Sequence, residues 1–156
     1  MWSSRLGRRL WIWGPVVLWL GVIALESTPM FGADHTAGPL ERLFALFHGP
    51  FTPSQWWAWH HAIRKAGHVV GYGMFAVIYF RAYWLSFAGW ASQAFRRVDA
   101  HLLALMSTFV VASLDEWHQT FLPGRTGQAS DAVLDTCGGL VMCGVVWGIG
   151  CFRRPH

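Results

Sequence analysis

Residues 115–135 read DEWHQTFLPGRTGQASDAVLD, and this polar segment lies between two apolar segments of helical length. Half of the eight Asp and Glu residues of the chain lie in it, together with a Pro-Gly-Arg sequence and one histidine. A polar turn between two apolar helices is typical of a helical hairpin in a membrane, with polar groups at the helix ends. The segment therefore predicts an all-α protein whose last two helices it joins.

The composition places the whole chain among integral membrane proteins. Hydrophobic residues make up 54% of its 156 residues and charged residues only 13%, which is too apolar for a soluble domain of this size. The net charge of +4 does not indicate a nucleic-acid partner, because most basic residues lie at the ends of apolar segments, where they orient membrane helices. The three cysteines, Cys137, Cys143 and Cys151, share the last apolar segment, so we expect no disulfide.

Apolar segments at about residues 10–26, 66–89, 101–118 and 131–152 predict four transmembrane helices in a single domain, 1–156. No small-x-small site follows the first segment, so we expect it to remain uncleaved. The apolar spacing of residues 39–47 and a start signal at Ser54 predict short interfacial helices in the first extracytoplasmic loop. The predicted fold is therefore an all-α, polytopic protein that crosses the cell membrane several times.

The basic residues predict the orientation of these helices. With the N-terminus inside, the cytoplasmic segments hold seven arginines and the outer segments hold four basic residues, so both termini are expected in the cytoplasm. Asp115 and Asp135 each lie eighteen residues from a cytoplasmic arginine, which is about 27 Å along a helix. Lys65 lies sixteen residues from Arg81, about 24 Å away. In a hydrocarbon core of about 30 Å, all three groups meet near the outer surface.

Helical spacing predicts which side chains face one another at this level. Lys65, His68 and Tyr72 share a face of the second helix, Asp115, His118 and Gln119 share a face of the third, and Asp131 and Asp135 share a face of the fourth. These faces should turn inward, because a charged group that faces lipid is costly. Glu116 is out of phase with Asp115, so we expect it to face a neighbouring helix or water. His35, His48, His60 and His61 are interpreted as surface histidines of the first outer loop.

Two further features shape the last helix pair. Pro123 and Gly124 fit the central positions of a type II turn, after which Arg125 points back over the polar cluster. Small residues at Gly138, Gly139 and Gly144 permit close packing of the last helix against a neighbour.

Three motifs within residues 64–144 make the chain resemble the VanZ-like family of membrane proteins. They are KAGHVVGYG from Lys65, DEWHQTFLPGR from Asp115 and DAVLDTCGGLVMCG from Asp131. The family pattern has Asp-Lys-x-x-His-Phe, then Asp-Glu-x-x-Gln-x-Phe-x-Pro-Gly-Arg, then an Asp and an Asn four residues apart at the start of a glycine-rich helix. The chain departs from it at Arg64, Val69, Gln128 and Asp135, where the family often has an acid, Phe, Ser and Asn.

The resemblance implies a small four-helix membrane protein. The namesake of the family is linked to resistance towards teicoplanin-type glycopeptide antibiotics, but the family as a whole has no agreed reaction. At Asp135 the departure adds a carboxylate to the polar cluster, so a role that needs a neutral amide there is not expected in this chain.

Three hypotheses about function fit the polar cluster. In the first, it is a site at the outer membrane face that binds or modifies a lipid-linked cell-envelope component, such as a cell-wall precursor, or a glycopeptide. In the second, the same residues form a network of salt bridges between helices in a non-catalytic structural or binding protein. A path for protons or ions is a third reading of ionisable groups within a membrane.

The first hypothesis assigns roles to individual residues. The acid–base candidates are Asp115, Glu116, His118 and Asp131, and the substrate-binding candidates are Lys65, His68, Gln119, Arg125 and Asp135. Arginine and lysine suit phosphate or carboxylate oxygens. No Ser or Cys stands in a nucleophile motif, and the expected partners are membrane lipids. No cofactor and no metal ligand is assigned; a metal that bridges His68, His118 and an acid stays an alternative, although no HExxH or comparable ligand pair supports it.

Overall fold

The computed structural model describes residues 4–89, 92–123 and 125–152, with the backbone alone at residue 152. Its helices are α1 (Arg5–Glu26), the 3-10 helix η1 (Pro29–Phe31), α2 (Ala33–His48), α3 (Pro53–Ser86), α4 (Gln93–Gln119) and α5 (Ala129–Phe152). No β-strand forms among the described residues. The predicted all-α class is confirmed.

Three described helices, α1, α4 and α5, are long and apolar enough to cross a membrane. The sequence predicts four such helices, and α3 is the one that differs. Although α3 is the longest helix, it is not among the three that qualify by length and composition. Polar side chains explain the difference, because residues 66–86 include His68, Tyr72 and Arg81.

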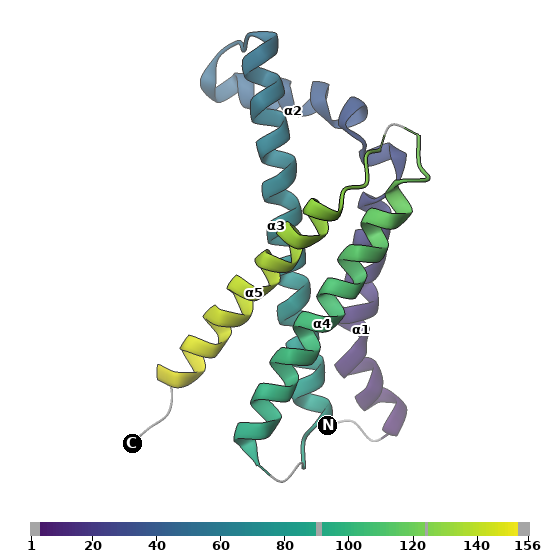
Figure 1. Cartoon of the computed structure of the whole chain (residues 1–156), viewed down its shortest axis with the longest axis vertical. Helices are drawn as coiled ribbons and strands as arrows, with labels where there is room; N and C mark the ends of the chain where they lie inside the picture. Colours follow the sequence, from purple (N-terminus) through teal and green to yellow (C-terminus); the bar gives the residue numbers. More distant parts are fainter. Residues whose placement is uncertain (1–3, 90–91, 124, 153–156) are drawn as a thin grey trace.

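The position of α3 explains why it can be polar. It packs against α1, α4 and α5, and Figure 1 shows it running through the middle of the molecule. Phe75, Ala76 and Ala82 on this helix have no exposed surface. A helix that is covered by its neighbours presents fewer side chains to lipid, so it needs less apolar surface than the helices around it.

Glycines allow α5 to approach α3 closely. A Cβ atom at Gly138 would lie 2.3 Å from the carbonyl oxygen of Val69, and one at Gly73 would lie 2.8 Å from the side chain of Met142. At Gly139 the same atom would be tightly surrounded, whereas at Gly144 it would meet nothing within 4 Å. The predicted close packing is therefore confirmed at Gly138 and Gly139 and is wrong at Gly144.

Of the two short helices predicted between the first and second spans, one forms as a separate helix and the other does not. The predicted segment 39–47 forms part of α2. The helix predicted to start at Ser54 is not separate, because it forms the first turns of α3. Thr52 and Gln55 exchange hydrogen bonds in a capping box, and Pro53 occupies the first turn, so the α3 helix starts here and continues to Ser86. The interfacial position of these segments stays a prediction.

The two ends of the bundle differ in chemistry. One end carries α2, the start of α3 and the α4–α5 connection, and the opposite end carries the start of α1 and of α4 (Figure 1). At the opposite end, arginines lie over tryptophan rings: Arg81 over Trp11 at 4.7 Å, Arg96 over Trp84 at 3.9 Å and Arg97 over Trp147 at 4.2 Å. Such cation–π pairs suit a membrane interface, where aromatic rings gather and long side chains reach towards water.

Candidate functional site

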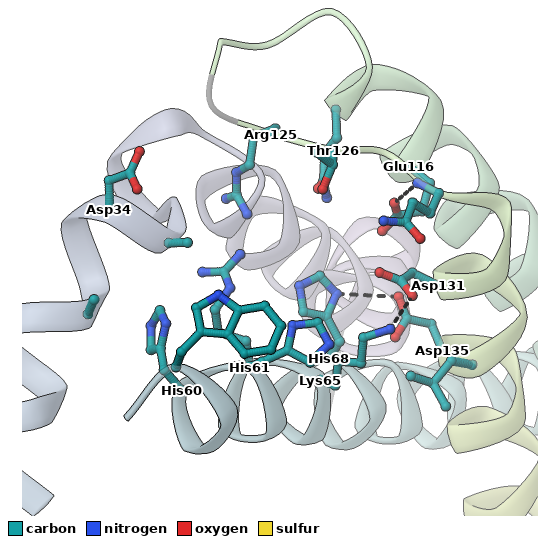
Figure 2. A pocket seen from close by; sticks show the side chains of 17 residues that line it. Asp34, His60, His61, Lys65, His68, Glu116, Arg125, Thr126, Asp131 and Asp135 are labelled. Atoms are coloured by element: carbon teal, nitrogen blue, oxygen red, sulfur yellow. Dashed lines mark hydrogen bonds and ion pairs between the residues drawn. The ribbon is translucent and has the colours of Figure 1, made fainter. Parts of the chain in front are cut away.

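A cavity of about 340 Å³ lies at the end of the bundle that carries α2, within the range of about 300–1,000 Å³ that is common for small-molecule sites. Its polar lining comes from four helices and one loop. It comprises Asp34 of α2; His60, His61, Arg64, Lys65 and His68 of α3; Glu116 and Gln119 of α4; Arg125, Thr126 and Gln128 of the α4–α5 loop; and Asp131 and Asp135 of α5. Figure 2 shows the carboxylates of α4 and α5 on one side and His60 and Arg125 away from them.

Two ion pairs join α3 to α5 at the floor of this cavity. Lys65 Nζ lies 2.8 Å from Asp131 Oδ1, and both side chains are partly exposed. His68 Nδ1 lies 3.4 Å from Asp135 Oδ2, and the Asp135 side chain is only 1% exposed. The two pairs lie next to each other because Lys65 and His68 are about one helical turn apart on α3, and Asp131 and Asp135 are about one turn apart on α5. The structure thus brings together the predicted faces of the second and fourth helices.

Glu116 faces the cavity, although the sequence places it out of phase with the cluster. Its side chain is buried, and Oε2 accepts a hydrogen bond of 2.8 Å from the backbone N–H of Gln128. The α4–α5 loop returns tightly against this part of α4, since a Cβ atom at Gly127 would lie 2.0 Å from the Glu116 carbonyl oxygen. A glycine is needed there, because the loop could not otherwise hold the carboxylate in place.

Asp115 has a different environment from Glu116. One oxygen accepts hydrogen bonds of 3.0 Å from Tyr72 and from Gln119, and the other accepts from Ser27 at the end of α1. Asp115 is not among the described residues that line the cavity. Its carboxylate connects α1, α3 and α4, so its position suits a structural connection better than proton transfer at the cavity.

The remaining predicted residues divide between the two environments. Gln119 is buried, bonds to Asp115 and also lines the cavity. His118 is exposed and is not among the described residues that line the cavity. The shared face that the sequence predicts for Asp115, His118 and Gln119 therefore does not form, because α4 turns the histidine outward.

Two arginines of the cavity lining bind the segment between α1 and α2. Arg125 donates to the carbonyl oxygens of Glu26 and Thr28, the second at 2.8 Å, and Arg64 donates to that of Phe31 at 2.8 Å. Neither guanidinium lies within ion-pair distance of a carboxylate of the described residues. The Arg125 Nε is buried and donates to none of the described groups. Both side chains therefore bring positive charge to the cavity without a neutralising acid in contact.

Burial and mutual repulsion act on these cations. Burial lowers the pKa of Arg64, and the positive charge of Arg125 lowers it further. Burial also lowers the pKa of Arg125, while the carboxylates of Asp115 and Glu116 act in the opposite direction. Both groups stay protonated because the pKa of arginine starts so high. An anion in the cavity would relieve the repulsion between them.

Sequence reasoning missed the contribution of His60 and Arg64. His60, interpreted as a surface histidine, is buried and lies 3.1 Å from the Thr36 hydroxyl of α2. Burial, with the charges of Arg64 and His61, lowers the pKa of His60. The signal was present in the sequence, because His60, Arg64 and His68 repeat every four residues along α3 and so share one face.

The turn after α4 is described except at its glycine. The Arg125 N–H donates to the Leu122 carbonyl oxygen at 3.3 Å, so these two residues lie close together. The predicted type II geometry depends on Gly124, which lies outside the described residues. Arg125 itself lines the cavity, as the sequence predicts.

A comparison with family models now relates this site to known proteins. A model described as VanZ/LLP1 matches residues 12–152, nearly the whole chain. The chain belongs to the VanZ/LLP1 family. The match extends beyond the motifs at 64–144 to include most of α1 and the following Ser27, which donates to Asp115 in this VanZ/LLP1 protein. Searches of curated proteins and of solved structures find no match.

Proposed function

We propose that this VanZ/LLP1 protein is a multi-pass protein of the cell membrane in which residues 66–86 of α3 form a fourth span. Three helices have the length and composition of spans, and α3 packs against all of them. Polar residues within a span are tolerated when they face other helices or a wet cavity. The polar residues of α3 meet this condition, since Tyr72 is buried and His68 lines the cavity.

In this topology the cavity lies at the outer membrane face and both termini lie in the cytoplasm. The arginines at the opposite end of the bundle support this orientation, because Arg96 and Arg97 lie where the positive-inside rule expects them. The α2 helix then lies across the outer surface as an interfacial helix, and its exposed Leu46 and Phe47 would enter the headgroup region.

We propose that the cavity binds the phosphate-bearing head group of a lipid-linked cell-envelope component. The observation that carries this proposal is the pair Arg64 and Arg125, which line one cavity with no carboxylate in contact with either guanidinium among the described residues. Guanidinium groups bind phosphate oxygens through two parallel hydrogen bonds. The buried Nε of Arg125 adds a donor without a described acceptor.

The same cavity also holds groups that could act on a bound ligand. Glu116 and Asp131 both line it and are the acid–base candidates that face the ligand in this arrangement. His118 and Asp115 do not have that position. A turnover assay with a labelled lipid-linked precursor therefore distinguishes an enzyme from a binding protein, and only an enzyme would form a new product.

The alternative function, a purely structural network, is favoured by a specific part of the cluster. Asp115 receives three hydrogen bonds from three segments, so its carboxylate is fully used within the protein. Such a group stabilises the bundle and needs no ligand. The arginines differ, because they bond to backbone carbonyl oxygens and, for Arg64, to the Thr36 hydroxyl, and they lack anionic partners among the described residues.

The proposed function predicts that Arg125→Lys weakens binding of a phosphorylated lipid. Purified protein in detergent would be titrated with a short-chain polyprenyl diphosphate, with the matching polyprenol as a ligand that lacks the phosphates. Lysine keeps the charge but loses the bidentate hydrogen bonds, so the affinity for the diphosphate should fall about tenfold, or about 1.4 kcal/mol. Arg64→Lys should act in the same direction.

The control is Arg42→Lys on the exposed part of α2, outside the cavity, which should leave both binding and thermal stability unchanged. Binding of the polyprenol as tight as that of the diphosphate would contradict the proposal. A loss of thermal stability in Arg125→Lys without any loss of binding would instead support the structural alternative. In cells, teicoplanin-type resistance is the phenotype that binding of a cell-wall precursor would support, and Arg125→Lys should reduce it.

A further inference from the structure

Three side chains at the acidic side of the cavity converge on one point from three helices. One ligand atom each from His68 of α3, Glu116 of α4 and Asp135 of α5 lies within 4.8 Å of the others. Glu116 and Asp135 are buried and His68 is partly buried. Figure 2 shows the His68 ring directed at Asp135, with Glu116 on the same side of the cavity. Ligands about 2.0–2.1 Å from one ion lie within about 4.2 Å of one another, so small side-chain rotations complete such a site.

The charges of this cluster are not balanced by the protein. Two buried carboxylates this close repel each other, and burying them without compensation is costly. The nearby Lys65 does not compensate them, because its Nζ pairs with Asp131 at 2.8 Å. Of the described cations only His68 reaches Asp135, at 3.4 Å, which is a long hydrogen bond. A divalent cation between the three groups would neutralise both acids.

Asp135 provides a second, independent observation. Its Oδ1 is buried and has no hydrogen-bond partner among the described residues, although the side chain is 99% enclosed. A buried carboxylate oxygen without a partner is rare in a folded protein and suggests an ion that occupies its free lone pair. The same side chain offers Oδ2 towards His68, so Asp135 faces the cluster with one oxygen and retains an unused one.

The surrounding protein fixes the orientation of the acids. The backbone N–H of Gln128 binds Glu116 Oε2 at 2.8 Å, which leaves the other oxygen of Glu116 for a ligand. Asp135 is placed by the close contact of Gly138 with Val69, three residues further along α5. Hydrogen bonds and packing that orient the ligands are typical of metal sites.

We propose that His68, Glu116 and Asp135 bind one divalent transition-metal ion, Zn²⁺ or Mn²⁺. One imidazole nitrogen and two carboxylate oxygens form a donor set that suits these ions, whereas Mg²⁺ and Ca²⁺ prefer oxygen alone and soft ions prefer sulfur. Three protein ligands leave at least one coordination position for a water or an oxygen of a ligand in the cavity. The metal proposal does not depend on the proposed lipid binding, because metal binding is measured with no lipid ligand present.

The test uses purified full-length protein in detergent, freed of metal with EDTA and then titrated with Zn²⁺ or Mn²⁺ alone. The wild type should bind one ion per chain at this site, measured by calorimetry and by metal analysis after gel filtration. Asp135→Asn, Glu116→Gln and His68→Gln should each weaken the binding at least tenfold. Asp34→Asn, a cavity-lining carboxylate of α2 outside the cluster, should bind the ion as the wild type does.

A second measurement does not depend on any variant. In the Mn²⁺-loaded wild type, pulsed electron paramagnetic resonance should detect one coordinated imidazole nitrogen. The proposal is overturned if the wild type binds no stoichiometric metal or if the loaded protein lacks that nitrogen. It is also overturned if the three cluster variants fold and bind metal like Asp34→Asn. If the wild type binds metal but does not bind the diphosphate, the result would count against the lipid proposal alone.

Discussion

Asp115 and Glu116 are neighbours in the sequence, yet they serve different parts of the molecule. Asp115 connects α1, α3 and α4, whereas Glu116 lines the cavity. Their separation follows from helical geometry, because consecutive residues point about 100° apart. The sequence predicts that the two differ in phase, but it assigns Asp115 to the inward face, whereas Glu116 is the one that lines the cavity. That choice depends on Ser27, whose approach to Asp115 is fixed by the path of the chain after α1.

The closed environment of Asp115 gives a prediction about stability. Asp115→Asn removes the negative charge and replaces one accepting oxygen with a donating NH₂ group, so the remaining hydrogen bonds lose their charge assistance and one bond must reverse or break. We expect the thermal midpoint in detergent to fall, by the equivalent of about 1–3 kcal/mol. Diphosphate binding by the folded variant should stay within a factor of about two, because the residue does not line the cavity.

Asp34→Asn is the matched control, since Asp34 is exposed and should keep the wild-type midpoint. An unchanged midpoint for Asp115→Asn together with a loss of binding would show that Asp115 contacts the ligand, as the sequence alone suggests.

At the scale of elements, α3 shows both what the sequence can predict and what it cannot. The start of this helix is encoded locally, since Thr52, Pro53 and Gln55 form a capping box with proline in the first turn. The residues of its cavity face repeat every four positions, so that face can also be predicted from the sequence. Its role as the central helix cannot be predicted, because hydropathy measures apolar character and not which neighbours cover a helix.

The contact between α5 and α3 gives a prediction with an internal control. Gly138→Ala would place a Cβ atom 2.3 Å from the Val69 carbonyl oxygen, so the helices must separate. We expect a loss of about 1–3 kcal/mol from overpacking and weaker metal binding, because Asp135 moves relative to His68. Thermal unfolding and metal titration of the same preparations measure both effects.

Gly144→Ala is the control on the same helix, where a Cβ atom meets nothing within 4 Å. Alanine should leave metal binding unchanged and add up to about 1 kcal/mol through its higher helix propensity. Equal stability of the two variants would contradict the close contact of α5 with α3.

At the scale of the whole molecule, the number of residues that separates each polar group from an arginine determines the level at which its charge lies. Counting residues from the arginines predicts that three helix ends meet at one level, and the pairs Lys65–Asp131 and His68–Asp135 form there. The sequence does not predict that Arg64 and Arg125 hold the segment between α1 and α2. Those contacts join residues far apart in the chain, and no local pattern encodes them.

In the proposed arrangement, the cavity opens at the outer membrane face and binds a phosphorylated lipid there. The most direct test places one cysteine at Thr126, an exposed residue of the cavity lining. In a background with Cys137, Cys143 and Cys151 replaced by alanine, Thr126→Cys would be exposed to a membrane-impermeant maleimide on intact cells. Gln93→Cys, at the start of α4 on the opposite end, is the matched control.

We predict that Thr126→Cys reacts on intact cells and that a short-chain polyprenyl diphosphate slows the reaction, whereas the matching polyprenol does not. Gln93→Cys should react only after the membrane is permeabilised. Reaction of Thr126→Cys only after permeabilisation, or at the same rate with and without the diphosphate, would contradict the account.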